Sequence, residues 1–292
     1  MKLMMGKTEM VMGSKYLTEL KDSSDILSNP ALQRQRMEED GYLYIRGFHE
    51  LEPVLNARRE MLESLRDKGM LDPDQLWEEG YIGLENKSLS FHNQATEYPE
   101  FLKLVNSERV LGFFEQLLGE QCLTFDTKWF RAIQQGGNSG AHYDIVYMGK
   151  GTKNVYTVWT PLGDIPLEMG GLAVCLGSHQ FEKVKKTYGS ADYEKVSGWF
   201  SENPVDIVHQ FGGQWATAHF KLGDAIIFGM YTMHASFNNE TNRYRISSDT
   251  RYQRSSEPVD PRWHGPKTAA AKNEDEVQSV ITMEEARREW GI

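Results

Sequence analysis

The chain has 292 residues, of which 39% are hydrophobic and 25% charged, and its formal net charge is −10 at pH 7. This composition is typical of a globular protein with a substantial core, and the acidic balance argues against a nucleic-acid partner, because phosphate binding requires a basic surface. No apolar run approaches the ~20 residues of a membrane helix, no signal peptide is evident, and two cysteines favour a reduced, cytoplasmic protein.

The first part of the chain is predicted to be largely helical. Residues 1–23 are polar and unpatterned, so we expect a loosely held tail there. Residues 24–121 read as supporting helices and a strand, because apolar residues recur at helical spacing and glycines follow the predicted helix ends. The predicted elements are a helix at 31–40, a strand at 42–48, a helix at 55–68 and a helix pair between 100 and 119.

The second part, residues 122–255, is rich in short alternating strands separated by turn residues. Such a series after a helical half favours a barrel or jelly roll flanked by helices, in one domain over 1–292. Residues 181–215 interrupt the series, and a connection of that length is often a lid; residues 70–98 are a second candidate. The tail, 256–292, ends in a predicted helix. The predicted strands are 123–133, 155–162, 171–176, 216–220, 225–231 and 244–252, and the final helix is 283–290.

A His-x-Asp motif, His142-Tyr143-Asp144, and a later His234 carry the strongest chemical signal. Residues two apart on a strand point to the same face, so His142 and Asp144 can converge on one ion. An isolated motif of this kind is usually an ordinary polar pair, but His234 follows another apolar strand and supplies a third ligand. Two histidines and one carboxylate leave three positions of an octahedral ion open, which is typical of non-haem Fe(II) oxygenases.

Four further residues are weaker candidates. Arg245 lies on the next predicted strand, where its guanidinium could hold a carboxylate through two hydrogen bonds. Arg131, on the strand before the motif, could reach a co-substrate or an anionic substrate, although an ordinary ion pair is the simpler interpretation. Tyr143 points away from its neighbours and suits core packing better than catalysis. His92 could line a substrate pocket or face water from a loop.

Several positions match a known family in order and spacing. They are His142-x-Asp144, Trp159, Gly170-Gly171-Leu172, Gly177-Ser178-His179, Gly223-Asp224, His234-x-Ser236, Asn239 and Arg245. With these residues the chain resembles the phytanoyl-CoA dioxygenase (PhyH) family over roughly residues 38–253. The resemblance implies a mainly β fold with flanking helices, a double-stranded β-helix of the jelly-roll, cupin-like type. It also implies a non-haem Fe(II)/2-oxoglutarate-dependent dioxygenase acting on a small organic molecule.

The resemblance assigns roles to individual residues. Arg245 would bind the distal carboxylate of 2-oxoglutarate with help from the Ser236 hydroxyl, and Trp159 would pack near that co-substrate. O2 would be the second co-substrate, and succinate and CO2 would be released as a C–H bond is oxidised. Halogenating relatives replace the metal carboxylate with a small residue, so Asp144 favours hydroxylation. His179 would belong to a turn. The Fe(II) ligands would be His142, Asp144 and His234.

Two other functions remain open from the sequence. The chain could be a catalytically silent β-helix protein that binds a ligand, in which case it would consume no 2-oxoglutarate with any substrate. It could also be a cupin-like enzyme that uses another metal and no keto acid. Arg245 and Ser236 argue against the second alternative, because such an enzyme needs no carboxylate anchor at that place.

Overall fold

The structure is a computed structural model that describes residues 1–91, 97–265 and 280–292. Its strands are β1 (Lys2–Met5), β2 (Thr8–Val11), β3 (Leu17–Glu19), β4 (Tyr42–Ile45), β5 (Leu89–Phe91), β6 (Cys122–Thr124), β7 (Trp129–Ile133), β8 (Ser139–His142), β9 (Tyr156–Pro161), β10 (Leu172–Leu176), β11 (Val196–Ser197), β12 (Gln214–Thr217), β13 (Ala225–Gly229), β14 (His234–Ser236), β15 (Arg245–Arg254) and β16 (Ile281–Thr282). Its α-helices are α1 (Pro30–Asp40), α2 (Leu51–Asp67), α3 (Pro99–Val105), α4 (Glu108–Leu118), α5 (Ile145–Met148), α6 (Glu182–Lys186), α7 (Pro204–Phe211) and α8 (Met283–Trp290).

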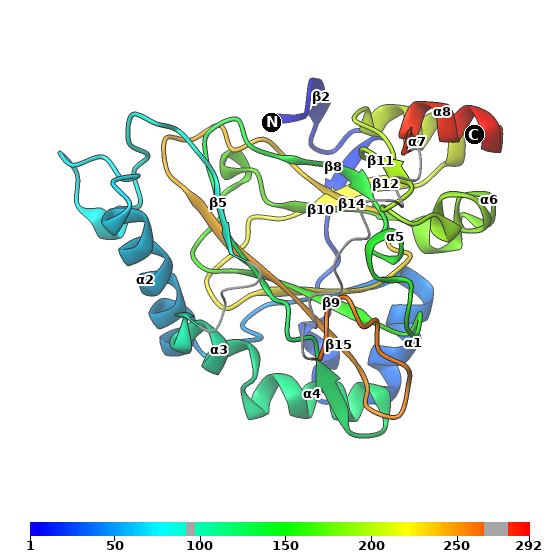
Figure 1. Cartoon of the computed structure of the whole chain (residues 1–292), viewed down its shortest axis with the longest axis horizontal. Coiled ribbons are helices and arrows are strands. Elements are labelled where there is room, and N and C mark those ends of the chain that lie inside the picture. The colour runs from blue at the N-terminus through cyan, green and yellow to red at the C-terminus, as the bar shows by residue number, and fades with distance from the viewer. Residues whose placement is uncertain (92–96, 266–279) are drawn as a thin grey trace, which may run out of the picture.

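Two facing β-sheets form the centre of the protein, with the helices outside them (Figure 1). The larger sheet has the strand order β4-β13-β9-β15-β7-β5, with β6 also paired to β15, and the smaller has the order β3-β12-β10-β14-β8. From β7 to β15 the chain passes repeatedly between the two sheets, because β7, β9, β13 and β15 belong to one and β8, β10, β12 and β14 to the other. This winding confirms the predicted double-stranded β-helix with flanking helices.

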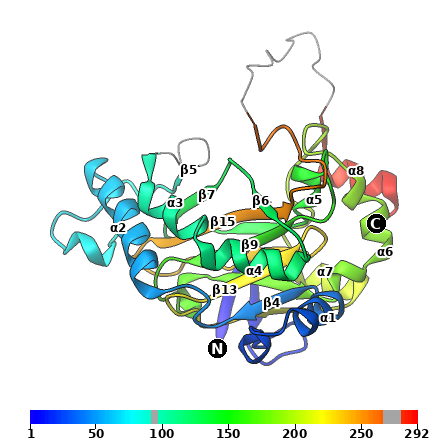
Figure 2. The ribbon, with the colours of Figure 1, turned by 90° about the horizontal axis from the view of Figure 1, so that it is seen from below.

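The outer face of the larger sheet is covered by α2, α3 and α4 (Figure 2). Strand residues alternate between two faces, so β7 and β15 present every second side chain to these helices. Phe130 of β7 stacks on Phe101 of α3, and Tyr252 of β15 stacks on Phe114 of α4, each with ring centroids 4.3 Å apart. The intervening residues of the same strands therefore face the space between the sheets, where the predicted site residues lie.

Part of the space between the sheets is filled by an apolar cluster. Trp159 and Phe228 of the larger sheet and Val174 of the smaller sheet belong to this buried cluster. The remaining part carries polar side chains, which are concentrated on one face of β15. The polar part holds the candidate site, and the apolar cluster adjoins it, because the ring of Phe228 lies 4.6 Å from that of His234.

The first 23 residues are an ordered part of the fold, so the predicted loose tail is wrong. β1 and β2 form a hairpin, and β3 pairs in parallel with β12, Leu17 opposite Trp215. The side chain of Asn238 ties the hairpin turn down by hydrogen bonds of 2.9 Å to both the N–H and the carbonyl of Gly6. Burial of apolar side chains explains this order; the buried residues are Leu3, Met5, Met10, Leu17 and Leu20.

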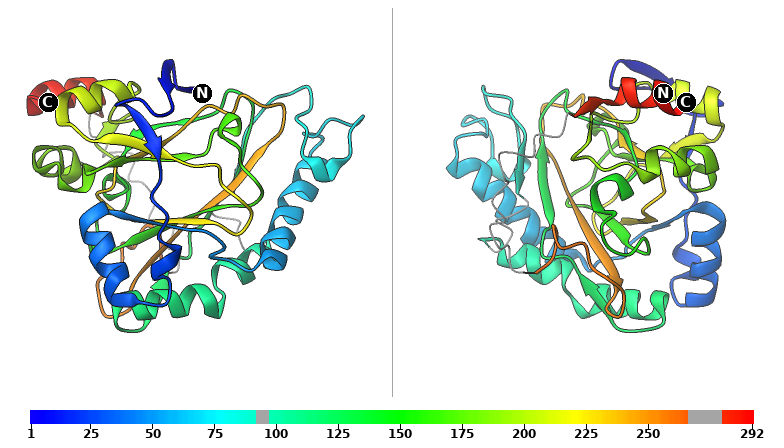
Figure 3. Two further views of the ribbon diagram at one scale, coloured as in Figure 1. Left: turned by 180° about the vertical axis from the view of Figure 1, so that it is seen from behind. Right: turned by 45° about the vertical axis from the view of Figure 1, so that its right-hand side comes forward.

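The long insertion and the C-terminal tail pack on each other. The insertion, 181–215, contains α6, β11, α7 and the first residues of β12, and β11 pairs in parallel with β16 of the tail. The helix α8 matches the predicted helix at 283–290, and it begins with a capping box in which Thr282 and Glu285 bond each other's backbone N–H groups. In Figure 3 α6, α7 and α8 lie close together, on the opposite side of the molecule from α2. No helix in the described ranges is long and apolar enough to cross a membrane.

One predicted strand is interrupted. The expected strand at 123–133 is two shorter strands, β6 and β7, separated by Phe125–Lys128. Both pair with β15, because Tyr252 lies opposite Thr124 and Asp249 lies opposite Trp129. The interruption leaves their shared partner continuous, and β15 carries Arg245 and Arg251 on the face that points between the sheets.

We expect the folded protein to lose stability in acid because His49 is buried. Its Nε2 lies 3.0 Å from the Thr160 hydroxyl, and burial, aided by the Arg109 cation, lowers the pKa of His49 to about 3. An unfolded histidine titrates near ~6.5. Between these values the unfolded chain binds one more proton, so stability falls as pH falls, by about 1.4 kcal/mol per unit for this residue.

The measurement is urea unfolding of the parent and of His49→Gln at several pH values between 7.5 and ~4.5. Glutamine keeps a polar group near Thr160 but takes up no proton. We expect the stability of the variant to fall less steeply with acid by about 1.4 kcal/mol per unit. Parallel curves for the two proteins would contradict the assignment.

Candidate metal centre

His142 and His234 are brought together by strand pairing. β8 and β14 run antiparallel in the smaller sheet, with His142 directly opposite His234 and their ring centroids 4.1 Å apart. Asp144 reaches the same place by a different route from the one predicted. It does not continue the strand; its backbone is helical (φ −65°, ψ −27°), and it is the residue immediately before α5. The turn from β8 into α5 therefore directs Asp144 back toward the histidines.

The three side chains offer one ligand atom each at one point. Nε2 of His142 and Nε2 of His234 lie 3.9 and 3.7 Å from Oδ1 of Asp144. One ligand atom from each of the three residues can be chosen so that all three lie within 4.8 Å of one another. Nδ1 of His142 is 2.9 Å from the Gly140 carbonyl, and Nδ1 of His234 is 3.0 Å from the Thr232 carbonyl. A carbonyl only accepts, so each Nδ1 carries the proton and each Nε2 presents a lone pair. This donor set fits a divalent transition metal.

Protonation also favours metal binding. Burial, with a contribution from His234, lowers the pKa of His142 to about 3, so the imidazole is neutral at physiological pH. Burial would raise the pKa of Asp144, but the Arg251 cation and the Thr157 hydroxyl outweigh it and hold that pKa below its usual range. A metal ligand must be a neutral imidazole or an ionised carboxylate, and His142 and Asp144 are in these forms.

Arg245 is a buried cation near these ligands. Its Nη1 donates to the carbonyls of Gly170 and Phe237, and its Nη2 lies 3.4 Å from the Ser236 hydroxyl. Its Nε is buried without a hydrogen-bond partner, and in the described part of the chain Arg245 forms no ion pair. Burial lowers its pKa to about 10, which leaves it charged at neutral pH. A buried cation without an anion is costly, so this geometry fits an anionic ligand.

A model of the phytanoyl-CoA dioxygenase (PhyH) family matches residues 37–247. The chain belongs to the PhyH family. Two related proteins are the 1-deoxypentalenic acid 11-beta-hydroxylases of Streptomyces exfoliatus and Streptomyces arenae. The first is 26% identical over 253 residues, covering 81% of this chain and 86% of the relative. The second is 24% identical over 248 residues, covering 80% and 84%.

Solved structures share the fold. One is SnoK, a non-haem alpha-ketoglutarate-dependent carbocyclase from nogalamycin biosynthesis, with a TM-score of 0.58, 15% identity and coverage of 86% of this chain and 92% of SnoK. Another is EctD from S. alaskensis with 2-oxoglutarate and 5-hydroxyectoine, with a TM-score of 0.56, 20% identity and coverage of 81% and 79%. As a PhyH member with the ligand set in place, the chain is an Fe(II)/2-oxoglutarate-dependent dioxygenase, as predicted.

The weaker site predictions have mixed outcomes in the PhyH fold. Trp159 lies between the sheets and packs on Phe220, with ring centroids 4.8 Å apart; its contact with a co-substrate stays a prediction. Arg131 donates from Nε to Asp249 at 2.8 Å, which is the ordinary ion pair considered as the alternative. Tyr143 is fully buried and donates its hydroxyl to the Ser178 carbonyl, so it packs in the core as expected.

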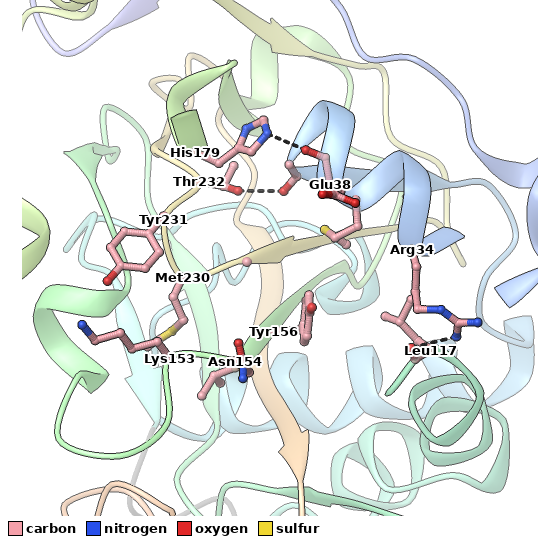
Figure 4. Close-up of a pocket in the computed structure, with 14 residues that line it drawn as sticks. Arg34, Glu38, Leu117, Lys153, Asn154, Tyr156, His179, Met230, Tyr231 and Thr232 are labelled. Carbon is pink, nitrogen blue, oxygen red and sulfur yellow. Dashed lines mark hydrogen bonds between the residues drawn. The ribbon is translucent and has the colours of Figure 1, made fainter. Parts of the chain in front are cut away.

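His179 lies away from the metal ligands. It lines a cavity of about 350 Å³ between α1, the start of β9 and the turn before β14 (Figure 4). There its Nε2 is 3.0 Å from the Glu38 carbonyl, and Thr232 donates to the Gly41 carbonyl. None of the three metal ligands lines this cavity. His179 belongs to a single 3-10 turn, Ser178–Gln180, shortly after β10, which agrees with the turn that the family resemblance implies. His92 lies outside the described residues.

The insertion reaches the metal centre through Trp199. The Trp199 ring lies 4.8 Å from the His142 ring, while 38% of the residue remains exposed. Gly140 makes this approach possible, because a Cβ at that position would lie 2.4 Å from the Trp199 ring. Beside Trp199 is a cavity of about 560 Å³, bordered also by the β1–β2 hairpin and by residues 201–204. The insertion thus covers one side of His142 and borders an adjoining space.

Sequence reasoning missed one functional neighbour, Arg251. Its Nη2 lies 3.0 Å from Oδ2 of Asp144, and the Thr157 hydroxyl donates to the same oxygen at 2.5 Å. Arg251 and Thr157 are direct partners in the β15–β9 pairing. The pairing of these two strands therefore positions both donors at the outer oxygen of Asp144. A signal was present in the sequence, because Arg251 is an even number of residues from Arg245 on one strand.

Proposed function

We propose that this enzyme hydroxylates an unactivated C–H bond of a small organic molecule and releases succinate and CO2 from 2-oxoglutarate. The observation that carries the proposal is the convergence of His142 Nε2, His234 Nε2 and Asp144 Oδ1 near a buried, unpaired Arg245. Iron held by the three ligands would supply the activation of O2. The protein's part is to bind and orient the co-substrate, to position the substrate and to exclude water.

Arg245 and Ser236 are the proposed anchor for 2-oxoglutarate. Arg245 has a free Nε, and its Nη2 already lies near the Ser236 hydroxyl, so a carboxylate there would meet donors from both residues. Ser236 is two residues from His234 on β14, which places the anchor beside the metal ligands. A charge-assisted hydrogen bond is about twice as strong as a neutral one, so the distal carboxylate would be held firmly.

Hydroxylation is supported by two observations. Asp144 is present and ionised, so no ligand position has been vacated for a halide. Two similar proteins are named as hydroxylases of a carboxylic acid, 1-deoxypentalenic acid. A substrate screen should therefore include cyclic carboxylic acids beside acyl thioesters and amino-acid derivatives. We also propose that the insertion, 181–215, acts as a lid through Trp199, whose ring lies against His142.

Anaerobic titration and a substrate screen test the proposal together. Fe(II)-loaded protein titrated with 2-oxoglutarate should develop a visible charge-transfer band, and a substrate from the screen should then release succinate once O2 is admitted. No band would overturn the co-substrate assignment. A band with no succinate from any substrate would instead favour the silent binding protein.

Removal of the proposed anchor should weaken 2-oxoglutarate binding. Arg245→Ala leaves the distal carboxylate without its cation, at a cost of about 1.5–3 kcal/mol for a hydrogen bond to a charged group, which equals a roughly 10- to 150-fold rise in Kd. The measurement is the anaerobic titration above. Arg243→Ala is the matched control, because Arg243 pairs with Glu79 at the surface and should leave the Kd unchanged. An unchanged Kd in Arg245→Ala would remove Arg245 from the site.

A further inference from the structure

The two carboxylate oxygens of Asp144 have different surroundings. Oδ1 faces Nε2 of both His142 and His234, at 3.9 and 3.7 Å. Oδ2 accepts hydrogen bonds from the Thr157 hydroxyl at 2.5 Å and from Arg251 Nη2 at 3.0 Å. One oxygen is thus directed at the metal position, and the other is held on the far side by a cation and a hydroxyl.

Arg251 is buried in this arrangement. Its guanidinium lies over the ring of Trp129, 4.3 Å from the centroid, and the residue is only 4% exposed. Asp144 is its ion-pair partner, and the other guanidinium nitrogens, Nε and Nη1, are buried with no hydrogen-bond partner in the described ranges. Asp144 is the only ion-pair partner of Arg251 among the described residues, so movement of the carboxylate away from it would leave a buried cation uncompensated, which is costly.

The number of oxygens that Asp144 gives to the metal matters for the reaction. Two histidine nitrogens and one carboxylate oxygen leave three of six positions open. A keto acid that binds through two oxygens fills two of them, and O2 needs the third. If Asp144 turned both oxygens to the metal, one position would be lost, and it would be taken from the co-substrate or from O2.

We propose that Arg251 is a positioning residue that restricts Asp144 to one metal-binding oxygen, so that 2-oxoglutarate can bind through two. The inference rests on the proposed function, because it concerns the same metal and co-substrate. Thr157 assists from the paired strand, but only Arg251 brings a charge to Oδ2. Its removal should therefore affect co-substrate binding more than metal binding.

The test compares two affinities in the same variants. Arg251→Met removes the cation and keeps most of the side-chain volume over Trp129, and Arg251→Lys keeps a charge. Fe(II) affinity is measured by anaerobic calorimetry, and the Kd of 2-oxoglutarate by the visible band of the Fe(II)-loaded protein. In Arg251→Met we expect the Kd of 2-oxoglutarate to rise at least tenfold, and by a larger factor than the Kd of Fe(II), and Arg251→Lys should recover part of the loss.

Thr157→Val provides a milder second variant if Arg251→Met does not fold. It removes the other donor to Oδ2 and should raise the Kd of 2-oxoglutarate in the same direction, with Thr157→Ser as its matched control. Equal losses of Fe(II) and 2-oxoglutarate affinity, or a 2-oxoglutarate Kd within twofold of the parent, would overturn the positioning role. Absence of the band in the parent would instead overturn the proposed function.

Discussion

Replacing His142, Asp144 or His234 with alanine is expected to abolish iron-dependent succinate formation. The three residues supply the whole cluster of metal-binding side chains found in the described ranges, and each contributes one ligand atom. Replacement of a residue that merely orients a metal ligand typically lowers metal affinity or activity by roughly 10- to 100-fold. Loss of a ligand itself should therefore reduce the rate by more than about 100-fold. Bound Fe(II) should fall in parallel.

Metal content and succinate release are the two measurements, made on the same protein preparations. Tyr143→Phe is the matched control, because Tyr143 lies between two ligands in the sequence yet directs its hydroxyl to the Ser178 carbonyl. It should bind Fe(II) like the parent. Substantial succinate formation by Asp144→Ala would show that the carboxylate ligand has been assigned wrongly.

Deletion of residues 1–20 is expected to destabilise the fold severely. The segment buries Leu3, Met5, Met10 and Leu17, and burial of each such side chain contributes about 1.5–3 kcal/mol. Four of them contribute on the order of 6–12 kcal/mol, which is comparable with the whole net stability of a typical domain, about 5–15 kcal/mol. The deletion would also expose the edge of β12, where unpaired backbone groups invite aggregation.

Point variants make the same test in graded form. Leu17→Ala should cost about 2–5 kcal/mol in urea unfolding, as other buried leucines do, because Leu17 is fully buried opposite Trp215. Glu19→Gln, on the same strand but exposed, is the control and should unfold like the parent. A truncated protein with the parent's urea midpoint would show that β1–β3 contribute little.

Elements with strong local patterns were predictable from the sequence. The strands β9, β10 and β13 follow apolar runs that end at turn residues, and their positions agree with the predicted strands to within one to two residues. The helix α4 was equally clear, since Ser107 caps its start and Gly119 follows its end with φ 77°. In these elements the local preference and the tertiary environment agree.

Elements that depend on distant partners were not predictable. β3 has three residues, of which only Leu17 is buried, and its order comes from pairing with β12 in another part of the chain. The prediction that Asp144 lies on a strand is wrong, because the alternating pattern of side chains before it does not indicate that α5 begins directly after it. In both cases the deciding interactions are long-range, and the local sequence carries no trace of them.

The metal-binding residues could be predicted from the sequence, but the residues that hydrogen-bond to them could not. His142 and His234 converge because β8 pairs with β14, and Asp144 joins them from the turn into α5; the family resemblance implied the ligand set but not this geometry. Arg251 was overlooked because a second arginine on β15 carries no motif of its own. Its role depends on the β9–β15 register, which sets it opposite Thr157 and is not visible in a single sequence.

The pairing of early strands with late ones has a consequence for biosynthesis. β3 joins the smaller sheet through Trp215, and β4 joins the larger sheet through β13, with Tyr42 opposite Phe228. Both strands leave the ribosome long before their partners are made, so they must wait unpaired. Such distant pairings form slowly. His142 and His234 also meet only after β14 has been synthesised, so closure of the sheets and assembly of the metal site depend on the same late stretch of nascent chain.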